Sequence, residues 1–365
     1  MLTSEIILHT DCRHFRGDIP CAPHKEHGVH CDGCEYYDKI TENILIIKLG
    51  AAGDVLRTTP LLHRIKLDHP TGRIWWLTLS PELVPASKVD KILKWDSHSL
   101  ETVNALHFTR LINLDKDHHA CALANRLSAD KKEGFLLDEF GNAKPASPIA
   151  YPKYLTGLFD DVSKMNTRSY MDEMFEICGY EFNGEKYILD APKDVTFEGL
   201  DLSRPLVGMN TGAGIRWTSR LWSVERWAEL AKKLHKAGYN VVFLGGPDED
   251  PRNKEIVKLA GGAAQYIGTF PLTTFISLVN KCSVVISGVT MAFHIALALE
   301  KKIVLINNIF NKYEFGDLYG LGTIIEPDKP CQCYFRGICV NPEYFCLDHL
   351  PTEKVFEAAI GSSGS

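Results

Sequence analysis

The segment Asn43-Ile-Leu-Ile-Ile-Lys-Leu49 runs directly into Gly50-Ala-Ala-Gly-Asp54, and together these residues indicate the type of fold. The first seven residues are a short apolar run of the kind that forms a buried strand in a parallel sheet. The glycines allow a tight turn after this strand. From Val55 to Leu67, apolar side chains at positions 55, 56, 62 and 65 follow helical spacing. The pattern therefore predicts a strand, a glycine-rich turn and a helix.

The same kinds of segment recur along the rest of the chain. Apolar runs that predict strands lie at 73–79, 110–114, 206–210, 240–244, 284–286 and 302–306. Segments that predict helices lie at 120–127, 160–186, 222–234, 272–279 and 294–299. Strands that alternate with helices predict a parallel, doubly wound sheet, so the expected fold class is α/β.

The length of the chain and a second glycine-rich turn indicate two domains. A chain of 365 residues exceeds what a single hydrophobic core usually serves. The proline-containing stretch around 190–204 reads as a linker. We therefore expect one α/β domain at 41–195 and another at 196–360, preceded by a Cys- and His-rich appendage at 1–40. The tail 361–365, Gly-Ser-Ser-Gly-Ser, is interpreted as the remnant of an expression tag.

Composition excludes several classes of function. The chain has 40 basic and 46 acidic residues, a net charge of −6, and so lacks the basic excess of a nucleic-acid-binding protein. It contains no apolar run of about 18 residues, so no transmembrane helix is expected. The first residues lack the basic and long apolar segments of a secretory signal. We therefore expect a cytoplasmic protein, and leave open a peripheral association with the inner membrane.

The first candidate site residue is Asp54, at the start of the first predicted helix. A carboxylate there can simply cap the helix, which is worth about 0.5–2 kcal/mol. Because ligands of open parallel sheets bind at the carboxyl ends of the strands, Asp54 is also a candidate general base. Such a base contributes roughly 10²–10⁴-fold to a reaction rate.

The second half of the chain supplies residues suited to a nucleotide. The loop Thr211-Gly-Ala-Gly214 and the helix start near Thr290 offer backbone amides to phosphate oxygens. Arg220 offers a bidentate partner for a diphosphate. His294 lies one turn into the later helix, where a histidine that merely packs in the core is the alternative.

Two further positions fit the nucleoside. Asp248 and Glu249 follow a predicted strand, where an acidic residue can accept hydrogen bonds from a ribose diol. Phe270 is a candidate to stack on the base, with core packing as the alternative.

Eight of the eleven cysteines form two groups, at Cys12, Cys21, Cys31 and Cys34 and at Cys331, Cys333, Cys339 and Cys346. In a reducing compartment such groups suggest a metal before a disulfide. The Cys31-x2-Cys34 pair has a spacing common in metal sites. We therefore expect a structural zinc or iron, or an iron–sulfur cluster, at the first group. Four unliganded thiols, or disulfides, are the alternatives. The second group is a weaker candidate because Cys-x-Cys pairs chelate less readily.

Four stretches together resemble glycosyltransferase family 9, the ADP-heptose:lipopolysaccharide heptosyltransferases: Ile44–Leu62, Leu111–Asp117, Val207–Leu234 and Val284–Leu299. The resemblance covers roughly Asn43 to Ala359. It implies a GT-B fold, in which two Rossmann-like domains face each other across a cleft. It also implies inversion at the anomeric carbon without a cofactor required for catalysis.

The resemblance also assigns roles to residues. It implies that Asp54 is the general base. It implies that donor-binding residues are Thr211, Gly212, Ala213, Gly214, Arg220, Asp248, Glu249, Phe270, Thr290, Met291 and His294. Where the family often has Asp-Thr-Gly, this chain has Val289-Thr290-Met291, which leaves the donor sugar open.

The expected activity is transfer of a heptose or a related sugar from an ADP-sugar, with ADP-heptose as the implied donor. The acceptor is a hydroxyl of a glycan, a lipid-linked glycan or a protein. Three alternatives remain at this point: a sugar-nucleotide epimerase or hydrolase of the same fold, a catalytically degenerate nucleotide-sugar-binding protein, and a metal- or redox-responsive protein. A requirement for an acceptor separates the first from a transferase.

Overall fold

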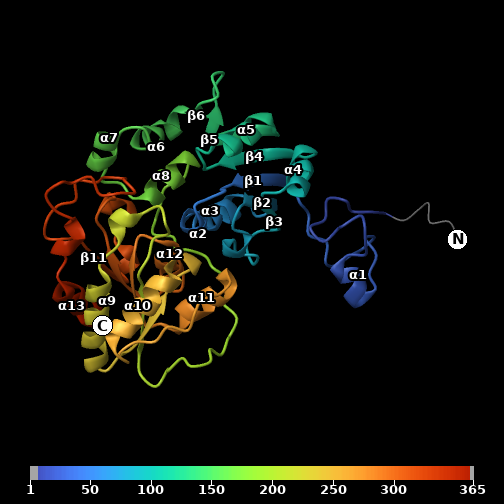
Figure 1. Cartoon of the computed structure of the whole chain (residues 1–365). Helices are drawn as coiled ribbons and strands as arrows, with labels where there is room; N and C mark the ends of the chain where they lie inside the picture. Colours follow the sequence, from blue (N-terminus) through green and yellow to red (C-terminus); the bar gives the residue numbers. More distant parts are fainter. Residues whose placement is uncertain (1–6, 362–365) are drawn as a thin grey trace. The chain divides into compact units, whose positions relative to one another are not determined.

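The computed structural model describes residues 7–361, which form two α/β units, each built around its own sheet (Figure 1). The first unit contains the chain up to Leu49 together with Leu61–Ala150. The second contains Gly50–Pro60 together with the chain from Tyr151 onward. Four of the five residues interpreted as a tag remnant, 362–365, lie outside the described residues. Within residues 7–361, no helix has the length and hydrophobicity needed to cross a membrane.

The sheet of the first unit has the strand order β3-β2-β1-β4-β5-β6. Its strands are β1 (Glu42–Ile47), β2 (Gly72–Thr78), β3 (Lys91–Lys94), β4 (His107–Asn113), β5 (Ser128–Leu137) and β6 (Ala143–Pro145). All neighbouring strands are parallel except the antiparallel pair β5–β6. The helices of this unit are α1 (Ala22–His27), α3 (Leu61–Asp68), α4 (Ser97–Asn104) and α5 (His118–Arg126), with 3-10 turns η1 (Pro81–Leu83) and η2 (Pro148–Ala150).

The sheet of the second unit is entirely parallel, with the order β11-β10-β9-β7-β8. Its strands are β7 (Leu206–Asn210), β8 (Asn240–Leu244), β9 (Val284–Gly288), β10 (Lys302–Ile306) and β11 (Gly322–Ile325). Its helices are α2 (Ala52–Thr58), α6 (Tyr151–Thr156), α7 (Asp160–Met165), α8 (Tyr170–Ile177), α9 (Val224–Lys236), α10 (Asp250–Ala260), α11 (Leu272–Lys281), α12 (Met291–Ala298) and α13 (Thr352–Gly361). Its 3-10 turns are η3 (Thr218–Arg220), η4 (Pro247–Glu249), η5 (Lys312–Phe315), η6 (Leu318–Gly320) and η7 (Cys346–His349).

The core of the second unit follows from the sequence patterns. The strands β7 and β8 are buried at every position, as expected of strands covered on both faces. Helix α9 buries Trp227, Leu230 and Leu234 on one stripe, and the Ser223 side chain caps its start by accepting from the Arg226 amide. This stripe shares a core cluster with α10, α13 and the strands. Helix α12 instead packs on β9 and β10 and contacts α11.

Two predicted helices are interrupted in the structure. The helix predicted from Val55 to Leu67 is divided into α2 and α3 because Pro60 cannot donate a backbone hydrogen bond. The helix predicted over 160–186 is divided into α7 and α8. Ser169 and Asp172 form a capping box that starts α8 afresh, and the chain leaves the helix at Gly179, whose φ is +72°.

The boundary between the units lies earlier than the predicted one at residue 195. Residues 151–195 belong to the second unit, and hydrogen bonds tie them there. The Asn311 amide donates to the Ser163 carbonyl at 2.7 Å and to the Asn166 carbonyl at 2.6 Å. The Ile188 amide donates to the Thr59 hydroxyl at 2.9 Å. The prolines at 190–204 therefore do not mark the boundary between the two units.

The predicted appendage belongs to the first unit. Cys12 and Lys39 form an antiparallel bridge just before β1 begins. Arg13 forms ion pairs with Asp38 at 2.8 Å and with Asp90 at 2.5 Å, and Asp90 also accepts from the amide of Ile74 in β2. These contacts connect the Cys-rich segment to the sheet.

Candidate functional site

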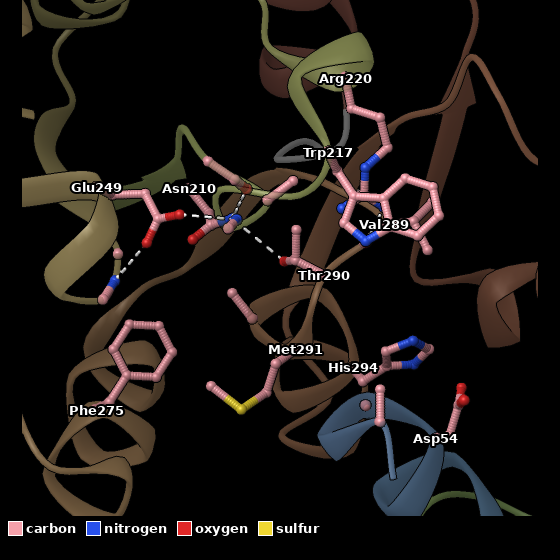
Figure 2. Close-up of a pocket in the computed structure, with 18 of the residues that line it drawn as sticks. Asp54, Asn210, Trp217, Arg220, Glu249, Phe275, Val289, Thr290, Met291 and His294 are labelled. Atoms are coloured by element: carbon pink, nitrogen blue, oxygen red, sulfur yellow. Dashed lines mark hydrogen bonds between the residues drawn. The ribbon is translucent and has the colours of Figure 1, made fainter. Parts of the chain in front are cut away.

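A pocket of about 610 Å³ opens in the second unit, and all of its lining residues belong to that unit (Figure 2). Its volume lies within the range of about 300–1,000 Å³ typical of small-molecule sites. The lining comes from the loops after β7, β8 and β9, from α2, and from the segment around Phe310 and Phe335. The pocket thus occupies the carboxyl ends of parallel strands, as the sequence predicted.

Glu249 joins two of these loops. Its Oε1 accepts from the Gly214 amide at 3.0 Å and its Oε2 accepts from the Gly246 amide at 2.9 Å. A Cβ atom added to Gly212 would lie only 2.1 Å from Glu249 Cγ, so this approach requires glycine. Glu249, which the sequence predicts as a ribose acceptor, lines the pocket, and its carboxylate also positions two of the pocket loops.

Two predicted donor-binding residues do not line the pocket. The Thr211 side chain is buried, and its hydroxyl donates to Asn253 Oδ1. Asp248 is exposed on η4. The other predicted residues are brought together in the lining: Asp54, Gly212, Ala213, Gly214, Arg220, Glu249, Phe270, Thr290, Met291 and His294.

Arg220 is a cation with incomplete hydrogen bonding. Its Nη1 donates to the Val289 carbonyl at 2.7 Å, whereas its buried Nε has no hydrogen-bond partner. The rings of Trp217 and Phe310 lie 5.3 and 5.1 Å from the guanidinium. Burial lowers the pKa of Arg220 to about 10, so the side chain stays charged at neutral pH. A partly desolvated cation of this kind favours an anionic ligand.

Asp54 lies in the first turn of α2 and is held by an arginine. Arg57 Nε contacts Asp54 Oδ1 at 2.9 Å, and Arg57 Nη1 lies 4.0 Å from Glu314 Oε2. The guanidinium also lies 3.4 Å from the centre of the Tyr170 ring. Although burial lowers the pKa of Arg57, the charge of Asp54 and other neighbours raise it above its ordinary value. The ion pair with Arg57 fixes the direction of the Asp54 carboxylate.

His294 packs directly against the start of α2. A Cβ atom on Gly53 would lie 2.5 Å from His294 Cδ2, so the histidine ring occupies the space that glycine leaves. Burial, with a smaller contribution from the charge of Arg57, lowers the pKa of His294 to about 3. The imidazole is therefore neutral at physiological pH. Its Nδ1 lies 3.3 Å from the Tyr187 hydroxyl.

The part of the pocket remote from Asp54 is apolar. Figure 2 shows Phe275 and Met291 on one side of the pocket and Asp54 on the other. Phe270 and Leu272 also line the pocket, and the Phe270 ring meets the Phe197 ring edge-on at 5.4 Å. Such a surface suits the flat face of an aromatic base.

The second cysteine group shapes another wall of the pocket. Phe335 lines the pocket in a loop between Cys333 and Cys339, whose sulfur atoms lie 3.5 Å apart. The Ser219 hydroxyl donates to the Arg336 carbonyl at 2.6 Å, which joins this loop to the residue before Arg220. A hydrogen bond from the Cys331 thiol lowers the pKa of Cys346 to about 6.

Sequence reasoning missed Arg57, Glu314 and the Phe335 loop. Arg57 had a local signal, because it lies one helical turn after Asp54 on the same helix face. Glu314 and Phe335 had no such signal, because only the fold brings them to α2 and to β7. Within residues 7–361, no His, Cys, Asp and Glu side chains form a group of three or more that could hold a single metal ion.

Comparisons with known proteins agree with this architecture. Residues 99–336 match the model of glycosyltransferase family 9 (heptosyltransferase). Lipopolysaccharide heptosyltransferase 2 of Salmonella typhimurium is 29% identical over 180 residues, a match that covers 48% of this chain and 50% of that protein. This chain therefore spans about half the length of the curated relative it matches.

Solved structures show the same fold. A glycosyl transferase family 9 protein from Veillonella parvula has a TM-score of 0.68 at 17% identity, covering 88% of this chain and 97% of that one. The E. coli heptosyltransferase WaaC with ADP has a TM-score of 0.63 at 15% identity, covering 88% of this chain and 99% of that one.

Proposed function

Because the chain belongs to glycosyltransferase family 9, the heptosyltransferase family, we propose that it transfers a heptose from ADP-heptose to a glycan hydroxyl with inversion. The observation that carries the proposal is a pocket that combines a partly desolvated cation, Arg220, with an oriented carboxylate, Asp54. Transfer with inversion needs both, because a base activates the acceptor while a second group stabilises the departing diphosphate.

The diphosphate is held by Arg220 and backbone amides. The unpartnered Nε of Arg220 donates to a phosphate oxygen and gains the hydrogen bond that it lacks in the protein alone. The amides at the start of α12, near Thr290 and Met291, add the positive end of the helix dipole. As the bond from the sugar to the phosphate breaks, negative charge grows on the diphosphate. These groups stabilise that charge, so no metal is required for the chemical step.

The acceptor is activated by Asp54. Its carboxylate accepts the proton of the incoming hydroxyl as the acceptor oxygen bonds to the anomeric carbon. The bond between that carbon and the diphosphate breaks on the opposite face, ADP departs, and the proton resides on Asp54. Arg57 holds the carboxylate at 2.9 Å and so orients it toward the pocket.

The nucleoside occupies the apolar side of the pocket. Phe270, Phe275 and Met291 offer apolar surface to a purine. The solved heptosyltransferase WaaC was determined with ADP, which supports an adenine nucleotide. The name of the Salmonella relative supports a lipopolysaccharide acceptor.

The test is an acceptor-dependence assay. Purified protein is incubated with ADP-heptose, with and without a heptose-deficient lipopolysaccharide core. ADP release and the mass of the glycan are followed together. We expect ADP release only with acceptor, and a glycan heavier by one heptose. ADP release at the same rate without acceptor would indicate a hydrolase and contradict the proposal.

A further inference from the structure

The N-terminal segment 7–40 has a defined course but almost no core. Within these residues only Cys12 and Pro23 are buried. Ile7, Leu8, Ile19, Tyr36 and Tyr37 are exposed, although each could contribute to a core. Segments of this size usually need a disulfide, a metal or a partner to fix their structure. Something other than apolar packing must therefore order this segment.

A hollow takes the place of the missing core. It has a volume of about 430 Å³ and is lined by Cys12, Cys21, Cys31 and Cys34, together with aromatic and histidine side chains of the same segment. All four cysteines are free thiols. A cysteine is normally buried among apolar neighbours, and four that line one hollow make a concentration of ligand atoms.

The four thiols reach the hollow from three local structures. Cys21 is the N-cap residue of α1. Cys31 and Cys34 flank a turn in which the Cys34 amide donates to the Cys31 carbonyl at 3.2 Å. Gly33 supplies the positive φ of +68° that this turn requires. Cys12 lies where the chain pairs with residues 38–40, and the Ile40 amide donates to the Asp11 carbonyl at 2.7 Å. Backbone hydrogen bonds thus define the local structure around each cysteine.

The geometry points to an iron–sulfur cluster, and we propose that Cys12, Cys21, Cys31 and Cys34 ligate one. In the part of the chain that the structure describes, no group of three or more such ligands could hold a single ion. A cluster differs from an ion because its iron atoms are separate, so its cysteine ligands need not converge on one point. A hollow larger than one ion, lined by four thiols, is what a cluster would fill.

Ligation of the cluster would also fix the structure of segment 7–40, which has almost no core. Each thiol loses its proton and bonds one iron, while ferrous or ferric iron and inorganic sulfide supply the rest of the cluster. The cluster cross-links Cys12 to the three later cysteines and thereby closes the segment on itself. Its anchorage to the sheet already exists, because the Arg73 side chain donates to the Arg13 carbonyl at 3.1 Å. The site lies in the first unit and the donor pocket in the second, so this proposal does not rest on the proposed function.

The test is anaerobic purification of the full chain, followed by iron, zinc and acid-labile sulfide analysis and visible absorption. We expect about two to four irons per chain with a matching amount of sulfide, the values for clusters held by four cysteines. Reduction should give the electron paramagnetic resonance signal of such a cluster. Zinc at about one per chain without sulfide, or no metal after reconstitution with iron and sulfide, would overturn the proposal.

Variants locate the site. Cys31→Ser and Cys34→Ser should lose most of the iron and sulfide. Cys282→Ala, which alters a buried thiol of the second unit, should keep them. Because the serine variants can fail to fold, the wild-type protein provides a second measurement. Oxidative removal of the cluster should make Cys12, Cys21, Cys31 and Cys34 newly reactive to an alkylating reagent, as mapped by mass spectrometry. Equal alkylation of these thiols before and after removal would count against the assignment.

Discussion

Gly53→Ala tests how the start of α2 is positioned. The added methyl carbon would lie 2.5 Å from His294 Cδ2, whereas ordinary contacts between carbon atoms begin near 3.4 Å. The difference, 3.4 − 2.5 = 0.9 Å, must be taken up by moving α2 or the histidine ring. Asp54 is the next residue on the same helix, so this shift moves the carboxylate that we assign as the base. A misplacement of about 1 Å can cost roughly 10²-fold in rate.

The assay for Gly53→Ala is steady-state transfer from ADP-heptose to a lipopolysaccharide core, with ADP affinity measured by calorimetry. We expect kcat to fall about 10²-fold with little change in ADP affinity, because Arg220 and the α12 start are untouched. Gly50→Ala is the matched control, since nothing lies within 4 Å of an added Cβ there. In a His294→Ala background, where the ring is absent, Gly53→Ala should cost far less. Wild-type kcat in the single variant would mean that the contact between Gly53 and His294 does not position Asp54.

Three further predictions follow from the pocket. Asp54→Asn should retain ADP binding and lose at least about 10²-fold in kcat, as measured by single-turnover transfer; turnover close to wild type would remove Asp54 from its role as base. Arg220→Ala should weaken ADP and ADP-heptose alike in calorimetry, while Arg216→Ala, at an exposed position, should not; unchanged ADP affinity would place the diphosphate elsewhere. The pKa of His294 is about 3 in the folded protein, against an ordinary value of 6.5 in the unfolded chain. Between these two pH values the unfolded chain binds a proton that the folded protein does not. The free energy of unfolding should therefore fall as the pH drops from 6.5 toward 3. In denaturant titrations across that range His294→Gln should reduce the pH dependence, and an unchanged slope would mean that the histidine is not buried in its neutral form.

The strand pattern and the location of the pocket could be predicted because both depend on local sequence. Each apolar run from Asn43 to Ile306 that was expected to form a strand does so, and the turns after β7, β8 and β9 line the pocket. The break between α2 and α3 at Pro60 also has a local cause. It was missed because the apolar residues on both sides of Pro60 follow helical spacing. The role of Gly53 was not visible locally, because the atom that excludes a side chain there belongs to His294, far away in the chain.

The roles of the predicted donor-binding residues also depend on partners that are distant in the sequence. From the sequence alone, the loop Thr211-Gly-Ala-Gly214 is as consistent with structural hydrogen bonds as with a phosphate-binding loop. Glu249 is likewise as consistent with a structural role as with a ribose acceptor. Which of these applies depends on partners supplied by the fold, such as Asn253 for Thr211 and two backbone amides for Glu249. The boundary between the units was also mislocated for a tertiary reason. Asn311 and Thr59 hold the segment after Ala150, and neither is near it in sequence.

An inverting transfer in one pocket, with Asp54 as the base, leaves its mark on the anomeric configuration of the product. Nuclear magnetic resonance of the heptosylated product, formed from ADP-heptose of known anomeric configuration, reads that configuration. We predict that the new glycosidic bond has the opposite configuration to the donor, and that Asp54→Asn forms the same product much more slowly. A product that retains the donor configuration would contradict the inverting mechanism.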